Sequence, residues 1–546
     1  MPNDHGAYNV ISKGGPPSKV FKGTREKLIN DVMTWFHNQD RTCAQLLFLN
    51  GIAGIGKSTV ASTVCLLVDG NGELGGSHFF SRINGRTNPA NVFTSLAFQL
   101  AKRDQILKKE IAGALEKDLD AGRGEIKNQL LTLIVGPLSR LPNPPSRLLL
   151  VIDALDECSV ADSGELLIPL LFHLPTIPFV KVLITGRPEQ HITSALIPRP
   201  GLQLQAVVMH NIEQHIMEKD VEIYLRASFA ELQERLRRRG IEWRWTEGQL
   251  KTLVKRSGKL FVYAVTVYKY ISNPKLADPE EQIKIILDAE TPPNSLSPYA
   301  DLDALYLQLL KIVLPLTDRD GRLIDRFQEV IGSIVTLIEP LPLASLTRFI
   351  TTKEGHIQLM LEAMTSVISA PENSQGIPEV YHPSFPDFIT DPTRCRDEQL
   401  IIVSHQAHAR LASSCLQLMI THLKRDICNI KDPSKLNDEV AGLENRVQDA
   451  IPSWLRYACV HWGQHISKAS VGNLQVKEHL EKFCRHRVMH WLEALSLLGR
   501  LEKGADFLEG VRKWAVSIYL CFANFSLIFC HHSRNLLVAQ TQCWVY

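Results

Sequence analysis

A glycine-rich segment at residues 49–62, LNGIAGIGKSTVAS, most constrains the fold of this chain. Glycine is costly in regular structure unless the backbone must adopt conformations that other residues avoid. The spacing of the glycines, with Lys57 and Ser58 directly after Gly56, fits the pattern G-x-x-x-x-G-K-[ST] of a phosphate-binding loop. An apolar run of strand type precedes the loop and an apolar run of helix type follows it, which is the context that the pattern requires.

This loop predicts how a nucleotide would be held. Its backbone N–H groups would wrap the phosphates, and the positive end of a helix starting near Lys57 would favour them. The Lys57 ammonium would reach the β and γ phosphates, and the Ser58 hydroxyl would bind Mg²⁺. The expected cofactors are ATP or ADP with Mg²⁺, and GTP is the alternative to ATP. The residues expected to contact the nucleotide are Gly51, Ile52, Ala53, Gly54, Ile55, Gly56, Lys57, Ser58 and Thr59.

A second stretch, RLLLVIDALDEC at residues 147–158, supplies acidic groups. Its unbroken apolar run is typical of a parallel strand buried on both faces. Asp153 stands at the carboxyl end of this strand, where ligands of open α/β sheets bind, and is the expected Mg²⁺ partner through water. Asp156 or Glu157, one short turn further on, would orient or deprotonate the attacking water. The alternative is that these two acids cap the next helix.

A third strand is predicted in VKVLITGRPEQHI, residues 180–192. The apolar run turns through Gly186, so Arg187 would stand at the tip of a strand in the same sheet. The planar fork of an arginine suits phosphate oxygens, and we expect Arg187 to face the γ-phosphate as a catalytic residue. A surface arginine in a turn is the alternative.

Together, the three motifs resemble the NACHT domains of signal-transduction ATPases, the STAND class that includes NOD-like receptors. The sequence DALDE, with a small residue right after the expected metal-binding Asp153, is specific to that group. Upstream, FKGTREKLINDVMTWF at residues 21–36 is similar to the segment of fungal NACHT proteins that leads into the sheet and helps enclose the adenine. Such fungal proteins are usually followed by WD repeats; no Trp-Asp dipeptide and no repeat of 20–50 residues is found in this sequence.

The resemblance extends to about residue 500. Residues 257–271 look like the small helical domain of the fungal family, 297–306 like the start of its next module, 330–350 and 381–395 like its winged-helix domain, and 454–466 and 488–500 like the helical segment before its repeats. In animal relatives, a motif similar to YHPSFPDF places a winged-helix histidine on the β-phosphate of ADP. The resemblance therefore implies a phosphate contact for His382, and a buried histidine at a helix start is the alternative.

The length of 546 residues allows about three or four domains. We expect an α/β P-loop NTPase domain, with a parallel sheet and helices on both faces, followed by helical, winged-helix and all-helical domains, so that the chain is mainly α. The expected boundaries are 1–19 for a flexible N-terminus, 20–205 for the NACHT domain, 206–298 for the small helical domain and linker, 299–395 for the winged helix, 396–507 for the helical domain and 508–546 for a divergent hydrophobic tail.

Composition bears on location and partners. The formal net charge of +2 gives no bulk attraction to nucleic acid. Eleven cysteines without paired spacing, and no secretory signal, predict reduced thiols and a cytoplasmic location. Residues 514–530 are seventeen uncharged residues, the lower edge of a membrane span, so a buried or aberrant C-terminal helix and a membrane tail anchor are both open. A truncation product would also explain the tail.

The helix predicted around residues 454–466 is expected to pack through one face, because Trp454, Tyr457, Ala458, His461 and His465 recur at helical spacing. For the whole chain, the sequence predicts a nucleotide-dependent switch. ADP would hold it closed, ATP would release a surface for self-association, and slow hydrolysis would reset it. A metabolic phosphotransferase on the same loop and a scaffold that binds nucleotide without hydrolysing it are the alternatives.

Overall fold

The computed structural model describes residues 7–8, 19–40, 43–118, 121–122, 124–158, 163–196, 204–274, 276, 278–289, 297–314, 321–432, 435–470, 472–501 and 504. The chain divides into two compact units, and each is described by itself. Unit 1 comprises Met1–Leu309, Thr365–Val367 and Tyr381–Phe385, and unit 2 comprises Leu310–Met364, Ile368–Val380 and Pro386–Tyr546.

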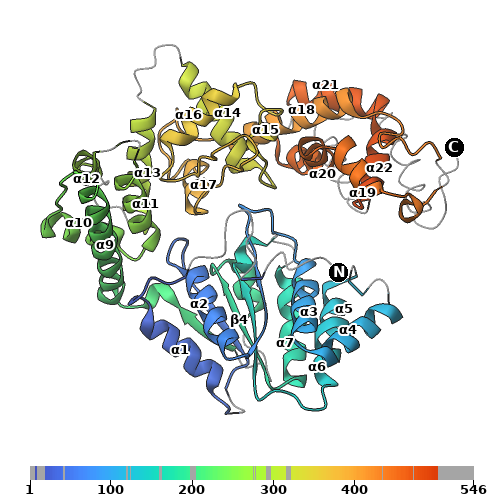
Figure 1. Ribbon diagram of the computed structural model, residues 1–546, viewed down its shortest axis with the longest axis horizontal. Coiled ribbons are helices and arrows are strands. Elements are labelled where there is room, and N and C mark those ends of the chain that lie inside the picture. The colour runs from blue at the N-terminus through green and yellow to red at the C-terminus, as the bar shows by residue number, and fades with distance from the viewer. Residues whose placement is uncertain are drawn as a thin grey trace. The chain divides into compact units, whose positions relative to one another are not determined.

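A five-stranded parallel sheet forms the centre of unit 1 (Figure 1). Its strands are β1 (Leu46–Asn50), β2 (Leu74–Phe79), β3 (Leu148–Asp153), β4 (Val180–Gly186) and β5 (Leu204–Val208). Their order is β2-β3-β4-β1-β5, which places β1 between β4 and β5 and next but one to β3. The carboxyl ends of β1, β3 and β4, where the three sequence motifs lie, therefore meet at one edge of the sheet.

Alternate residues of the strands enter two separate apolar cores, because successive side chains of a strand point to opposite faces. Leu47 and Leu49 of β1 join the core built with α1 and α2, whereas Leu46 and Phe48 join the core built with α3, α5 and α7. Figure 1 shows α1 and α2 on one side of the sheet and α3 to α7 on the other. These helices are α1 (Glu26–His37), α2 (Lys57–Gly70), α3 (Asn91–Arg103), α4 (Gln105–Lys117), α5 (Ile126–Leu130), α6 (Gly136–Ser139), α7 (Ser163–His173) and α8 (Gln190–Ala195). The predicted α/β class, with helices on both faces, is confirmed.

The rest of unit 1 is helical. It contains α9 (Gln214–Arg237), α10 (Glu247–Ser257), α11 (Phe261–Ile271), α12 (Pro279–Leu287) and the start of α13 (Ala300–Val313). Helix α10 begins at a capping box, in which Thr246 and Gln249 each accept from the other's backbone N–H. Helix α11 begins at Phe261, and its first turn lies against the glycine-rich loop.

Unit 2 is built from helices. They are α14 (Arg322–Thr336), α15 (Leu343–Leu346), α16 (Glu354–Ala363), most of α17 (Ser384–Ile389), α18 (Ser404–His422), α19 (Leu443–Ala450), α20 (Ser453–Lys468), α21 (Leu474–His486) and α22 (Val488–Leu497). In its core, Trp462 and Trp491 pack edge-on with ring centroids 5.4 Å apart, and the indole N–H of Trp491 donates to the carbonyl of Cys459 at 2.8 Å. The predicted domain boundaries within units 1 and 2 stay predictions.

Among the described residues, no helix is both long enough and apolar enough to cross a membrane. The uncharged segment at residues 514–530, for which a tail anchor is one alternative, lies outside the described part of the chain.

Candidate functional site

The glycine-rich loop joins β1 to α2 and needs glycine at two positions. Gly54 has φ +81° and Gly56 has φ +101°, in the left-handed region that other residues rarely adopt. Gly54 is also crowded, since a Cβ atom there would lie 2.4 Å from Cγ1 of Val262 on α11. Position 54 therefore requires glycine for two reasons: its left-handed backbone, and the close approach of Val262 on α11.

Four carbonyls of the loop have donors from the protein itself. The Lys57 ammonium donates to the carbonyls of Gly51 and Ile52 at 2.8 and 3.1 Å. The backbone N–H of Val262 donates to the carbonyl of Gly54 at 3.2 Å. The Arg25 guanidinium donates to the carbonyl of Ile55 at 2.8 Å. With these carbonyls held, N–H groups at the end of the loop next to α2 can face an anion. At the other end, the N–H of Gly51 donates to the carbonyl of Gly186 and that of Ala53 to the Tyr299 hydroxyl.

Arg25 is a site residue that sequence reasoning missed. Its side chain is buried, lies over the Phe261 ring at 5.7 Å and faces the Asp220 carboxylate of α9 at 3.6 Å. Burial lowers the pKa of Arg25, and the charge of Asp220 opposes that shift. Arg25 thereby connects the start of α1, the loop and the helical part of unit 1. The available signal was its place in FKGTREKL, but nothing local indicates that this arginine turns inward.

Asp153 lies at the end of β3 and is buried. The hydroxyls of Thr185 and Ser58 both hydrogen-bond to its carboxyl group. Burial raises the pKa of Asp153 to about 6, although both hydroxyls and the Lys57 charge pull it down. Mg²⁺ prefers oxygen ligands, and the Asp153 carboxylate and the Ser58 hydroxyl that hydrogen-bonds to it are two such groups at the end of the loop. A bound cation would also offset the cost of burying the carboxylate. Asp153 and Ser58 are thus the residues that would hold the metal.

The two acids after Asp153 have different partners. A short 3-10 turn, η2 (Leu155–Glu157), follows Ala154, which has a left-handed backbone with φ +57°. The turn directs Asp156 towards the tip of β4, where it faces Arg187. Glu157 instead accepts from the backbone N–H of Arg82 at 2.7 Å. The sequence did not distinguish the two acids. In the structure, the Asp156 carboxylate faces Arg187 just after β4, and the Glu157 carboxylate faces Arg82 just after β2.

Burial raises the pKa of Glu157 to about 7, and the neighbouring Asp156 and Asp153 charges act in the same direction. The N–H of Arg82 lowers this pKa, but less strongly than burial raises it. A carboxyl group that titrates near neutral pH is able to accept a proton and release it again. Glu157 therefore has the properties of a general base more clearly than Asp156.

His382 lies beside the loop, in the Tyr381–Phe385 segment that belongs to unit 1. Its Cε1 atom would be 3.7 Å from a Cβ atom placed on Gly54. The backbone N–H of Ser384 donates to Nδ1 of His382 at 3.0 Å, so Nδ1 is an acceptor and the proton of the neutral ring is on Nε2. Burial, followed by the charges of Lys57 and Arg187, lowers the pKa of His382 to about 3. The ring is therefore neutral at pH 7, with one N–H available as a donor.

The remaining predicted residues follow the loop into α2. Thr59 is in the first turn, where its carbonyl accepts from the Thr63 hydroxyl at 2.8 Å, and the Ser58 side chain is exposed. The structure thus brings the residues named from the three motifs, together with His382, to one end of the sheet of unit 1. Their predicted roles stay predictions.

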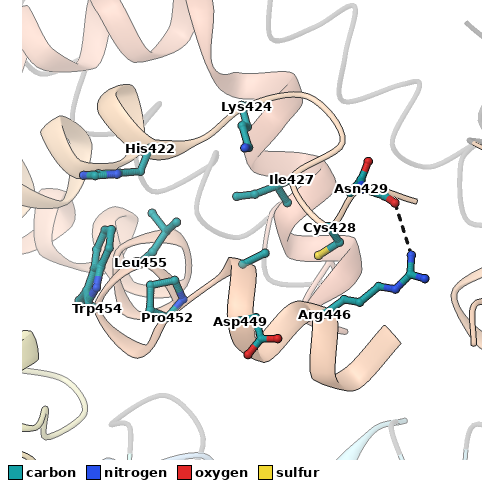
Figure 2. Close-up of a pocket in the computed structure, with 11 residues that line it drawn as sticks. His422, Lys424, Ile427, Cys428, Asn429, Arg446, Asp449, Pro452, Trp454 and Leu455 are labelled. Atoms are coloured by element: carbon teal, nitrogen blue, oxygen red, sulfur yellow. Dashed lines mark hydrogen bonds between the residues drawn. The ribbon is translucent and has the colours of Figure 1, made fainter. Parts of the chain in front are cut away.

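Unit 2 has a separate recess of about 560 Å³ between the end of α18 and the start of α20 (Figure 2). The rings of His422 and Trp454 form one wall with centroids 4.8 Å apart, and Arg446 donates to the carbonyl of Asn429 at 3.4 Å on the opposite side. Trp454, the first residue of the predicted packing face of α20, is half-buried and also packs under the guanidinium of Arg348, whose Cζ lies 5.7 Å from the ring centroid. The four residues expected on the same face are buried, namely Tyr457, Ala458, His461 and His465.

Comparisons with known proteins agree with the site. Residues 23–187 match the family described as Nephrocystin 3, N-terminal. A stretch of 99 residues is 34% identical to Vegetative incompatibility protein HET-E-1 of Podospora anserina, covering 17% of this chain and 7% of that protein. This chain therefore matches only a small part of the length of that relative.

Two solved structures are similar at low identity. A Walker-type ATPase of Pyrococcus abyssi has a TM-score of 0.33 at 12% identity, covering 68% of this chain and 97% of that one. PCH-2 of C. elegans has a TM-score of 0.28 at 13% identity, covering 53% and 71%. Since both TM-scores are below 0.5, the assignment of this chain rests on its loop, its sheet and the sequence matches.

The loop, the buried Asp153 on the next strand but one and the parallel sheet define a P-loop NTPase. Within that class, the sequence matches over residues 23–187 and over the 99-residue stretch support a P-loop ATPase domain of NACHT type, as the motifs predicted. The WD repeats that follow such domains in the fungal proteins are not part of this identification.

Proposed function

We propose that this chain is a nucleotide-dependent switch of the STAND class, which binds ADP or ATP with Mg²⁺ and controls its own self-association in intracellular signalling. The observation that carries the proposal is the position of His382, whose ring lies beside the phosphate-binding loop and carries its proton on Nε2. A hydrogen bond from His382 to a phosphate would make the segment around residue 382 sensitive to the nucleotide in the loop. The loop lies more than 300 residues earlier in the sequence. Such a contact biases a two-state equilibrium through one ligand group.

Hydrolysis would reset the switch. In this proposal, Glu157 orients or deprotonates the attacking water. Arg187 contacts the terminal phosphate, and Asp156 positions the Arg187 side chain for that contact. Mg²⁺ held by Asp153 and Ser58 would supply charge that stabilises the phosphates when it is bound. The rate is expected to be slow, because a switch needs a long-lived bound state.

The decisive experiment identifies the nucleotide that the protein carries through native purification, by mass spectrometry, and compares its native mass in ADP and in ATP. The proposal expects bound ADP, a monomer in ADP and larger assemblies in ATP. Lys57→Ala removes the ammonium from the loop and should lower nucleotide affinity by about ten- to a hundredfold, the usual loss for a charged hydrogen bond. A Lys57→Ala variant that binds Mg-ATP as tightly as the parent would contradict the assignment of the loop.

Turnover assays separate the alternatives. A phosphotransferase would show ATP consumption that depends on an added small-molecule acceptor, whereas a switch hydrolyses ATP slowly without one. A non-hydrolysing scaffold would bind nucleotide and release no phosphate over many hours.

A further inference from the structure

The hydroxyl of Tyr299 accepts a hydrogen bond from the backbone N–H of Ala53 in the glycine-rich loop, at 3.2 Å. The two residues are 246 positions apart in the sequence and belong to the same unit. Tyr299 directly precedes α13, and its carbonyl accepts from the N–H of Asp303 in the first turn of that helix at 2.8 Å. The phenol therefore connects the start of α13 to one peptide group of the loop.

Helix α13 also contacts the segment that carries His382, which lies beside the loop. Two turns along α13, the Tyr306 hydroxyl lies 2.9 Å from Oγ of Ser384, and that oxygen lies 2.8 Å from Nδ1 of His382. Because Nδ1 accepts, Ser384 donates to it and Tyr306 donates to Ser384. Helix α13 thus contacts the loop directly through Tyr299 and holds the histidine beside the loop through Tyr306.

The place of Lys57 shows which end of the loop Tyr299 occupies. The Lys57 ammonium folds back onto the carbonyls of Gly51 and Ile52, which lie two residues and one residue before Ala53 respectively. A lysine in this motif attracts the β and γ phosphates, so the Gly51–Ala53 end of the loop is the end where a terminal phosphate arrives. A phosphate oxygen is charged and accepts an N–H more strongly than a phenol oxygen does.

We propose that Tyr299 is a specificity-determining residue that distinguishes nucleoside triphosphate from diphosphate. Its hydroxyl holds the Ala53 N–H while a diphosphate is bound and gives up that N–H to the terminal phosphate of a triphosphate. Displacement of Tyr299 releases the start of α13 from the loop. This role of Tyr299 rests on the proposed nucleotide switch, because Tyr299 is the residue that would respond to the terminal phosphate.

The test compares Tyr299→Phe with the parent and with Tyr268→Phe. Tyr268, on α11, is half-buried like Tyr299 and packs its ring edge-on against Tyr224 with centroids 6.3 Å apart, so its variant controls for loss of a phenol hydroxyl. Dissociation constants for Mg-ADP and for a non-hydrolysable Mg-ATP analogue are measured by titration calorimetry. Tyr299→Leu, which also lacks the hydroxyl, serves as a second variant.

The preference for triphosphate over diphosphate should rise about two- to tenfold in Tyr299→Phe, the range for one neutral hydrogen bond, mainly through tighter analogue binding. Tyr299→Leu should change the preference in the same direction, and Tyr268→Phe should leave it at the parental value. A parental preference in both Tyr299 variants overturns the role of Tyr299. A parent that binds neither nucleotide overturns the proposed switch itself, so the two failures are distinct.

Discussion

The Arg187 guanidinium is held against the Asp156 carboxylate, with Nε of Arg187 3.0 Å from Oδ2 of Asp156. The backbone N–H of Arg187 donates to the other oxygen, Oδ1, also at 3.0 Å. Both oxygens of Asp156 are therefore engaged by the residue at the tip of the next strand. An acid held in this way is suited to position the arginine, so Glu157 is the acid that we propose to act on water.

We predict that Glu157→Gln keeps ATP binding and lowers phosphate release by about a hundredfold or more, the usual contribution of a general base. Asp156→Asn should instead loosen Arg187 and weaken nucleotide binding together with turnover. Single-turnover phosphate release and equilibrium titration distinguish the two effects. Glu110→Gln, which alters a surface ion pair with Arg140, is the matched control. Parental turnover in Glu157→Gln would remove Glu157 from the mechanism.

His382→Leu should release ADP faster and associate more readily at the same protein concentration. The substitution keeps bulk beside Gly54 but deletes the ring donor, and a hydrogen bond to a charged phosphate contributes about 1–3 kcal/mol. The ADP dissociation rate should therefore rise about five- to a hundredfold. Stopped-flow release of a fluorescent ADP analogue and native mass measure the two effects. His356→Leu, at an exposed position on α16, is the control, and equal release from His382→Leu and the parent would leave His382 as a packing residue.

Gly54→Ala should destabilise unit 1 and weaken nucleotide binding, for two separable reasons. The left-handed backbone costs a non-glycine residue about 1–2 kcal/mol, and the new methyl group would meet Val262. Gly72→Ala, at φ +67° with nothing within 4 Å of the new Cβ, measures the backbone cost alone. Adding Val262→Ala to Gly54→Ala should recover part of the lost stability, measured by urea unfolding. If Gly54→Ala costs no more than Gly72→Ala, α11 does not press on the loop.

Unit 2 should lose stability as the pH falls from about 6.5 towards 4. His408 and His465 share a hydrogen bond between their Nδ1 atoms at 2.8 Å, and Nε2 of His465 lies 2.7 Å from the Tyr457 hydroxyl. Burial lowers the pKa of His408 to about 4, and the Lys468 charge acts in the same direction. Burial also lowers the pKa of His465 well below its ordinary value, and His408, His461 and Lys468 add to that shift. In this pH range, the two histidines bind protons in the unfolded chain but not in the folded chain. The free energy of unfolding therefore falls as the pH falls.

The expected slope is up to about 1.4 kcal/mol per pH unit for each histidine. His408→Gln should reduce this slope, and His356→Gln should not. Urea unfolding followed between pH 7 and 5 gives the comparison, and an unchanged slope in His408→Gln would show that the histidine pair does not set the acid stability of unit 2.

The sequence by itself was sufficient to predict where the loop and Asp153 lie in the fold. Glycines at fixed offsets before Lys57 and Ser58 define a local backbone shape, and an apolar strand ending at Asp153 defines where its acid must stand. These features are short-range or follow from the geometry of parallel sheets. For that reason the α/β class and the NACHT-type assignment could be predicted before any tertiary contact was known.

Only the tertiary structure decided how the loop is held and which residues outside the loop hydrogen-bond to it. The contacts of Arg25 with Ile55, of Val262 with Gly54 and of Tyr299 with Ala53 join residues 30 to 246 positions apart. Each is one hydrogen bond, without a periodic or spaced pattern that a sequence could reveal. They form because apolar burial brings α1, α11 and α13 against the loop, and the side chains that then meet depend on that packing rather than on any local preference.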